Sequence, residues 1–132
     1  MAEKILTPEE FLGYKVGTEK KLADWPEIVE YFMKVGKTSP RVKVEKLGET
    51  TEGNPFILAT VTSEENMGKL EELRETQMRL SKPYGLSDEE AKTLMAKGKT
   101  VVLITCSIHS TEVGGSQMSM ELLHQLASCN CT

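Results

Sequence analysis

Apolar residues alternate with polar ones in one part of the chain, and this spacing predicts β-strands. Residues 41–46 place Val42 and Val44 on one face and charged residues on the other, which is the period of a half-exposed strand. Residues 56–62 form a second β-rich run, separated from the first by turn-forming residues. We expect the two runs to pair as a hairpin.

Other segments carry apolar residues three or four positions apart, which predicts amphipathic helices. Asp24 and Glu27 have the spacing of a capping box, and the helix they open is expected to end at Gly36. A charged helix is predicted over residues 63–81, and another is predicted to begin after Ser87. These helices are expected to pack against the strands.

The most informative segment begins with the continuous apolar run at residues 101–104. A run of this length is typical of a strand covered on both faces, as found inside an α/β sheet. A polar loop over 109–116 and a helix over 117–127 follow it. We therefore predict an α/β fold with a mixed sheet, helices packed on that sheet, and a strand at 100–106 in its interior. Ligands of such sheets bind outside the carboxyl ends of the strands, which makes the polar loop the candidate site.

Composition narrows the classes of partner. The chain has 132 residues, 39% of them hydrophobic, as expected for one globular domain. A net charge of -4 and the lack of a basic run exclude nucleic acid as an expected partner. No run approaches the roughly 18 apolar residues that span a membrane, and the polar start is unlike a signal peptide. Three cysteines are an odd number, and a bridge between Cys129 and Cys131 would be strongly strained at that spacing, so no disulfide framework can be read and the redox compartment stays open.

His109 and Glu112 are the candidate metal ligands. A catalytic zinc ion takes three protein ligands, commonly imidazole nitrogens and carboxylate oxygens, and leaves one position for water. The H-x-x-E spacing can bring one ligand of each kind to the same ion. The alternative is a hydrogen-bonded histidine beside a glutamate that favours a helix N-terminus. The position directly after a predicted buried strand favours the metal site.

Other residues are weaker candidates for a metal site or a catalytic site. His124 lies twelve residues beyond Glu112, about 18 Å along an unbroken helix, so it cannot share a zinc ion with Glu112. Cys129 and Cys131 form a conceivable soft-metal pair, although no further Cys or His lies near them. Ser116 sits in a segment similar to the G-x-S-x-G nucleophile elbow, but a methionine replaces the last glycine. A serine nucleophile is therefore disfavoured.

Three motifs in this order resemble the amino-terminal part of the zinc carboxypeptidase family, of the carboxypeptidase A type. They are Glu52-Gly53-Asn54-Pro55 before a strand, His109-Ser110-Thr111-Glu112 after one, and Val113-Gly114-Gly115-Ser116-Gln117 followed by a helix. Most of the likeness lies in residues 103–127, and residues 42–62 support it. The resemblance implies a mixed α/β sheet with helices on both faces, and one zinc ion bound at the carboxyl ends of central strands by His109 and Glu112.

The resemblance also implies a peptide substrate and a mechanism. In the family, zinc polarises the scissile carbonyl and activates a water molecule. A second histidine ligand, the arginines that bind the substrate's terminal carboxylate, and the glutamate that serves as general base all come far downstream. None of them has a counterpart in this chain. Residues 1–132 are therefore expected to be the amino-terminal part of a single catalytic domain, with two metal ligands, no complete catalytic set and no cofactor other than zinc.

Two alternative interpretations fit the same residues. A relative on this fold could hydrolyse the amide of an N-acyl or succinyl amino acid, with the same His109 and Glu112 on the metal. A domain that kept the fold and lost the site would have no activity. A chain that stops after the first interior strands is expected to leave an unpaired sheet edge, through which copies could self-associate.

Overall fold

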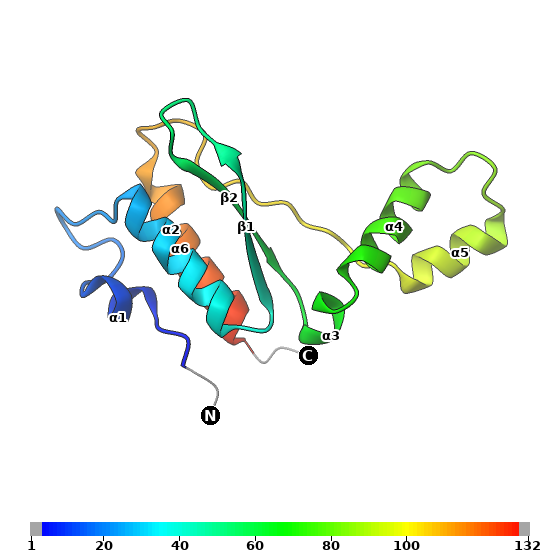
Figure 1. Cartoon of the computed structure of the whole chain (residues 1–132), viewed down its shortest axis with the longest axis horizontal. Coiled ribbons are helices and arrows are strands. Elements are labelled where there is room, and N and C mark those ends of the chain that lie inside the picture. The colour runs from blue at the N-terminus through cyan, green and yellow to red at the C-terminus, as the bar shows by residue number, and fades with distance from the viewer. Residues whose placement is uncertain (1–3, 130–132) are drawn as a thin grey trace. The chain divides into compact units, whose positions relative to one another are not determined.

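The computed structural model describes residues 4–129, which divide into two compact units. The first, called here the hairpin unit, contains the chain up to Thr62 and the chain from Thr105 onward. The second, called here the helical unit, is the intervening segment Ser63–Ile104. Figure 1 shows the elements of each. Because the arrangement of the two units relative to each other is not determined, each is described by itself.

The hairpin unit contains the two predicted strands. β1 (Val42–Glu49) and β2 (Pro55–Val61) pair antiparallel, with Val42 opposite Val61 at one end and Glu49 opposite Pro55 at the other. The register shifts between Lys46 and Gly48, which indicates a β-bulge. The predicted hairpin is therefore confirmed.

Helix α2 (Trp25–Thr38) packs against this hairpin and begins where its sequence predicts. The Asp24 side chain accepts a hydrogen bond from the Glu27 N–H at 3.0 Å, and the Glu27 carboxylate accepts one from the Asp24 N–H at 2.8 Å. This is the predicted capping box. The Trp25 indole N–H also donates to the carbonyl of Pro55, which ties the first turn of the helix to the start of β2.

The predicted end of this helix at Gly36 is wrong, because α2 continues to Thr38. Gly36 instead lies where the helix contacts β1. A Cβ atom at this position would lie 2.9 Å from Cγ2 of Val44, closer than real Cβ atoms approach a neighbour. The glycine therefore permits close packing of the helix on the strand. In the sequence alone, a glycine at this position indicates the end of a helix.

Replacing Gly36 by alanine should destabilise the hairpin unit. Alanine would gain up to about 1 kcal/mol in helix propensity, but crowding a branched side chain in a packed interface costs about 1–3 kcal/mol. We expect Gly36→Ala to lower the midpoint of chemical denaturation. When the same substitution is made in a Val44→Ala background, the midpoint should fall by much less relative to Val44→Ala alone. An increase in stability for the single variant would contradict the close contact.

The core of the hairpin unit forms where α2 meets helix α6 (Val113–Ser128) and the hairpin, with α1 (Pro8–Leu12) contacting both helices. Helices α2 and α6 run beside each other along the hairpin in Figure 1. The face of α6 that is buried carries Met120, Leu123 and Ala127. The buried apolar residues of the core are Ala23, Ile28, Tyr31, Val35, Val42, Met120, Leu123 and Ala127.

The predicted interior strand at 100–106 is wrong. This segment has no strand pairing, and Leu103 is 77% exposed. An interior strand needs a neighbour on each side, whereas the described residues provide two strands that pair with each other. On the hairpin itself, Phe56 is 57% exposed and Leu58 is also exposed, so within this unit the expected second helical layer does not cover that face. The chain is nevertheless α/β, with helices packed on a small antiparallel sheet.

The helical unit contains α3 (Glu64–Met67), α4 (Leu70–Ser81) and α5 (Asp88–Lys97). The single helix predicted over 63–81 is thus interrupted between Met67 and Leu70. Ser63 and Ser87 both cap the helices that follow them, as predicted. Helices α4 and α5 contact each other, and Arg79 and Glu90 form an ion pair at 3.3 Å. Neither His109 nor Glu112 belongs to this unit.

Candidate metal centre

The candidate site lies in the loop that leads into α6. Glu112 is the residue at the helix N-cap, and the helix begins at Val113. The N–H of Glu112 donates to the carbonyl of His109 at 3.0 Å, which closes a turn between the two residues. The Ser107 hydroxyl donates to the same carbonyl at 3.0 Å. The short loop is therefore held by bonds that converge on the backbone of His109.

The side chains of His109 and Glu112 meet directly. Nδ1 of His109 lies 2.8 Å from Oε1 of Glu112, and the His109 N–H donates to the other carboxylate oxygen at 3.4 Å. The hydrogen bond from the His109 side chain, followed by that from its backbone N–H, holds the pKa of Glu112 below its ordinary value. The His109 side chain is 69% exposed and that of Glu112 is 54% exposed, so the pair is open to solvent.

This pair fits part of a zinc site. An imidazole nitrogen and a carboxylate oxygen are both ordinary zinc ligands, and ligand atoms on one ion lie roughly 3–3.5 Å apart. A small widening of the present hydrogen bond would admit an ion between the two atoms. Among residues 4–129, however, no group of three His, Cys, Asp or Glu side chains is placed to bind a metal. The described residues therefore bring together two side chains of the kinds that bind zinc, whereas a catalytic zinc takes three protein ligands.

The remaining candidates do not join this pair. His124 lies further along α6, consistent with its exclusion as a shared ligand. Ser116 lies in the first turns of α6 rather than on a strand exit, so it lacks the setting of a nucleophile elbow. The suggestion of a soft-metal pair at Cys129 and Cys131 falls partly outside the described residues, because Cys131 is not among them.

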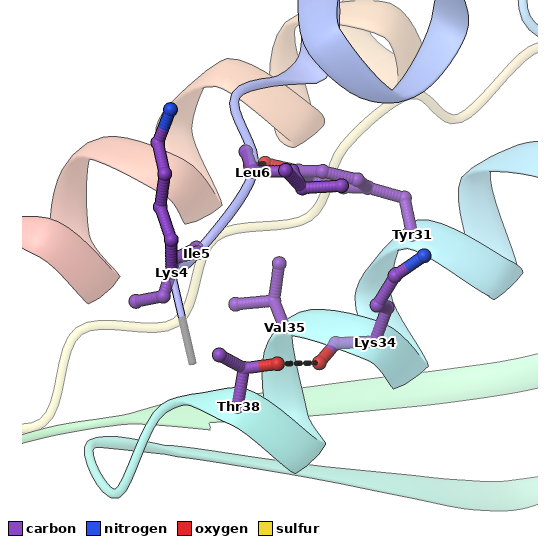
Figure 2. A pocket seen from close by; sticks show the side chains of 7 residues that line it. All are labelled: Lys4, Ile5, Leu6, Tyr31, Lys34, Val35 and Thr38. Atoms are coloured by element: carbon purple, nitrogen blue, oxygen red, sulfur yellow. Dashed lines mark hydrogen bonds between the residues drawn. The ribbon is translucent and has the colours of Figure 1, made fainter. Parts of the chain in front are cut away.

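The structure also contains a cavity of about 270 Å³ between the amino-terminal segment and α2. Figure 2 shows that its wall combines aliphatic side chains with the ring of Tyr31, and that Thr38 is bound to the backbone of Lys34. None of the described residues that line it carries a carboxylate, and neither His109 nor Glu112 is part of its wall. The lining residues are Lys4, Ile5, Leu6, Tyr31, Lys34, Val35 and Thr38.

Two residues near the pair have roles that the sequence pattern did not reveal. Gly115, in the first turn of α6, lies against the backbone of Ser107. Gln117, two residues further along the helix, makes two hydrogen bonds to the backbone of Ala23, at 3.0 and 2.8 Å. The sequence signal for Gln117 is a polar residue on the helix face that also carries buried apolar residues. It indicates a buried hydrogen bond only when the segment that faces the helix is known.

The structure thus shows an α/β chain that packs helices on a small sheet and places an exposed, hydrogen-bonded histidine–glutamate pair at the start of a helix. The sequence model of the zinc carboxypeptidase family matches residues 28–130, and the chain belongs to this family. The match includes the hairpin, the helical unit and the H-x-x-E segment. No curated protein and no solved structure matches the chain. Among the described residues, no helix is long and apolar enough to cross a membrane.

Proposed function

We propose that His109 and Glu112 are two ligands of a hydrolytic zinc ion in a metallocarboxypeptidase, an enzyme that removes carboxy-terminal residues from peptides. One observation carries the proposal. Nδ1 of His109 and Oε1 of Glu112 face each other at 2.8 Å where α6 begins, in a chain that belongs to the zinc carboxypeptidase family. The pair is exposed, so neither an ion nor a substrate needs to displace core residues to reach it.

The two residues would bind the ion, and the rest of the chemistry requires further groups. Zinc, when bound, polarises a carbonyl and lowers the pKa of a water ligand. His109 would supply a neutral nitrogen, and Glu112 a negatively charged carboxylate oxygen. Glu112 cannot act at once as a ligand and as a free base. A base for the water and a cationic group for the substrate's terminal carboxylate are therefore separate requirements.

Zinc binding tests the ligand pair. Because two protein ligands hold the ion, we expect weak binding at His109, and weaker binding on acidification, since a proton competes for the imidazole nitrogen. The chain has two histidines, so NMR can follow the ring signals of each during a zinc titration. Zinc should shift the His109 signals and leave those of His124 in place.

Isothermal titration calorimetry with His109→Ala and with His124→Ala gives the matched comparison. The first variant should lose the binding heat and the second should keep it. Tight, stoichiometric binding that survives His109→Ala would place the metal elsewhere and refute the proposed ligands.

A further inference from the structure

The backbone before His109 takes a conformation that few residues adopt. Ser107 has a φ of 74°, in the left-handed region where non-glycine residues are uncommon. Such a conformation persists when the surrounding contacts hold it. One such contact is the Ser107 hydroxyl, which donates to the carbonyl of His109. The other is with α6, and it depends on a glycine.

Gly115 provides the surface on which this backbone rests. A Cβ atom on Gly115 would lie 2.9 Å from the backbone N of Ser107, 3.5 Å from its Cα, and 3.6 Å from the carbonyl carbon of Cys106. All three neighbours are backbone atoms, so no side chain can rotate away to make room. Any larger residue at this position would therefore push the backbone of Ser107 away from the helix.

The adjacent glycine offers a natural comparison. Gly114 lies in the same helical turn, yet a Cβ atom there would meet nothing within 4 Å. Replacing either glycine by alanine makes the same chemical change and raises helix propensity by a similar amount. The two substitutions therefore differ in one respect, the contact with the loop that carries His109.

The helix itself is anchored to the core. Both ends of the Gln117 amide bond the backbone of Ala23, with the N–H of Ala23 donating at 3.0 Å and the amide nitrogen of Gln117 donating at 2.8 Å. Both residues are buried. Because Gln117 lies five residues after Glu112 on this helix, the anchor fixes the start of α6 and with it the backbone of Glu112.

We propose that Gly115 is a positioning residue for the metal ligands. It lets the Ser107 backbone lie against the first turn of α6, which returns the chain so that the His109 ring meets the Glu112 carboxylate. Gln117 supports the same geometry by holding the helix to Ala23. The inference rests on the proposed zinc site for its functional meaning, although the arrangement itself is a property of the metal-free chain.

The test compares Gly115→Ala with Gly114→Ala in the metal-free chain. We expect the ¹⁵N and ¹H signals of the His109 ring in Gly115→Ala to move toward those of Glu112→Ala, in which the hydrogen bond is absent. The signals in Gly114→Ala should overlay those of the wild type. The His124 signals and the far-ultraviolet circular dichroism should be unchanged in both variants, which separates a displaced loop from a disrupted fold.

Zinc titration of the same variants adds the functional readout. Loss of groups that orient a metal ligand typically weakens affinity by about 10- to 100-fold, so Gly115→Ala should bind zinc about tenfold more weakly than Gly114→Ala. If the wild type shows no zinc binding at His109, the proposed function fails, while the metal-free NMR comparison still decides the positioning role. Unchanged His109 signals in Gly115→Ala, or equal changes in both glycine variants, would overturn that role.

Gln117→Ala provides an independent variant should Gly115→Ala not fold. Its control is Leu123→Ala, which removes a buried side chain from the same helix but leaves the Ala23 anchor in place. At temperatures where both are fully folded, Gln117→Ala should shift the His109 signals and Leu123→Ala should not. Equal shifts in the two variants would show that any weakening of α6 disturbs the pair, and would refute a specific positioning role.

Discussion

Residues 1–132 alone are expected to release no measurable carboxy-terminal amino acid from a peptide. Hydrolysis requires a firmly held metal, a base for the water, and a group that positions the substrate's carboxylate. The described residues bring together His109 and Glu112, and they contain no cluster of three metal-binding side chains. An assay with a carboxy-terminally blocked peptide as control and excess zinc would check this. Turnover that disappears with His109→Ala would show that two ligands suffice.

If the gene continues past Thr132, the same peptidase activity can be measured in the longer protein. There we expect zinc-dependent release of carboxy-terminal residues, lost on chelation and restored by zinc. His109→Ala or Glu112→Ala should reduce turnover by at least about a thousandfold, since a metal contributes several kcal/mol of transition-state stabilisation. His124→Ala should retain activity. Activity that survives chelator and His109→Ala, but is lost with Ser116→Ala, would replace the metal mechanism by a serine nucleophile.

The same longer protein separates the proposed peptidase from its relatives in chemistry. An enzyme that cleaves the amide of an N-acyl or succinyl amino acid would use the same two ligands, so variants of His109 and Glu112 cannot distinguish it. Substrates can. Release of the last residue from an unblocked peptide, with no hydrolysis of an N-succinyl amino acid, is the outcome expected of a carboxypeptidase. The reverse pattern would favour the amidohydrolase.

Local sequence signals predicted the local structure well. The capping box of Asp24 and Glu27 and the caps at Ser63 and Ser87 each join residues three positions apart, and the hairpin joins two strands that follow each other through a single turn. The H-x-x-E spacing belongs to the same class, because a single turn joins His109 to Glu112. In each of these signals, the interacting residues lie close together in the sequence and can therefore be recognised from it.

Features that depend on distant partners were missed or misjudged. A continuous apolar run predicted an interior strand at 101–104, but such a strand forms only beside neighbours that pair with it. The sequence pattern at Gly36 indicates a helix terminator, because the contact of this glycine with Val44 cannot be read from spacing. The same holds for Gly115, whose importance lies in the backbone of Ser107, and for Gln117, whose partner is 94 residues away.

The isolated chain is expected to self-associate through residues 100–105, and we propose that identical copies pair along this segment. It contains no charge, proline or glycine, it is rich in β-branched residues, and it has no strand partner. Val101 and Leu103 are both 77% exposed. An exposed segment of this composition, without a strand partner, offers its backbone N–H and C=O groups and its apolar side chains to another strand. Sedimentation velocity over a range of protein concentrations should show growing oligomers.

The double variant Val102→Lys/Ile104→Lys should remain monomeric under the same conditions, because like charges on one face of paired strands repel. Its control is Tyr84→Lys/Met95→Lys, which adds the same two charges and also removes two exposed apolar side chains, from the helical unit outside this segment. The control should associate as strongly as the wild type. If both double variants are monomeric, association follows from net charge or general hydrophobicity. If the wild type is itself monomeric at every concentration and unfolds cooperatively, residues 100–105 are not an interface, and the expectation of an unpaired, reactive edge is wrong.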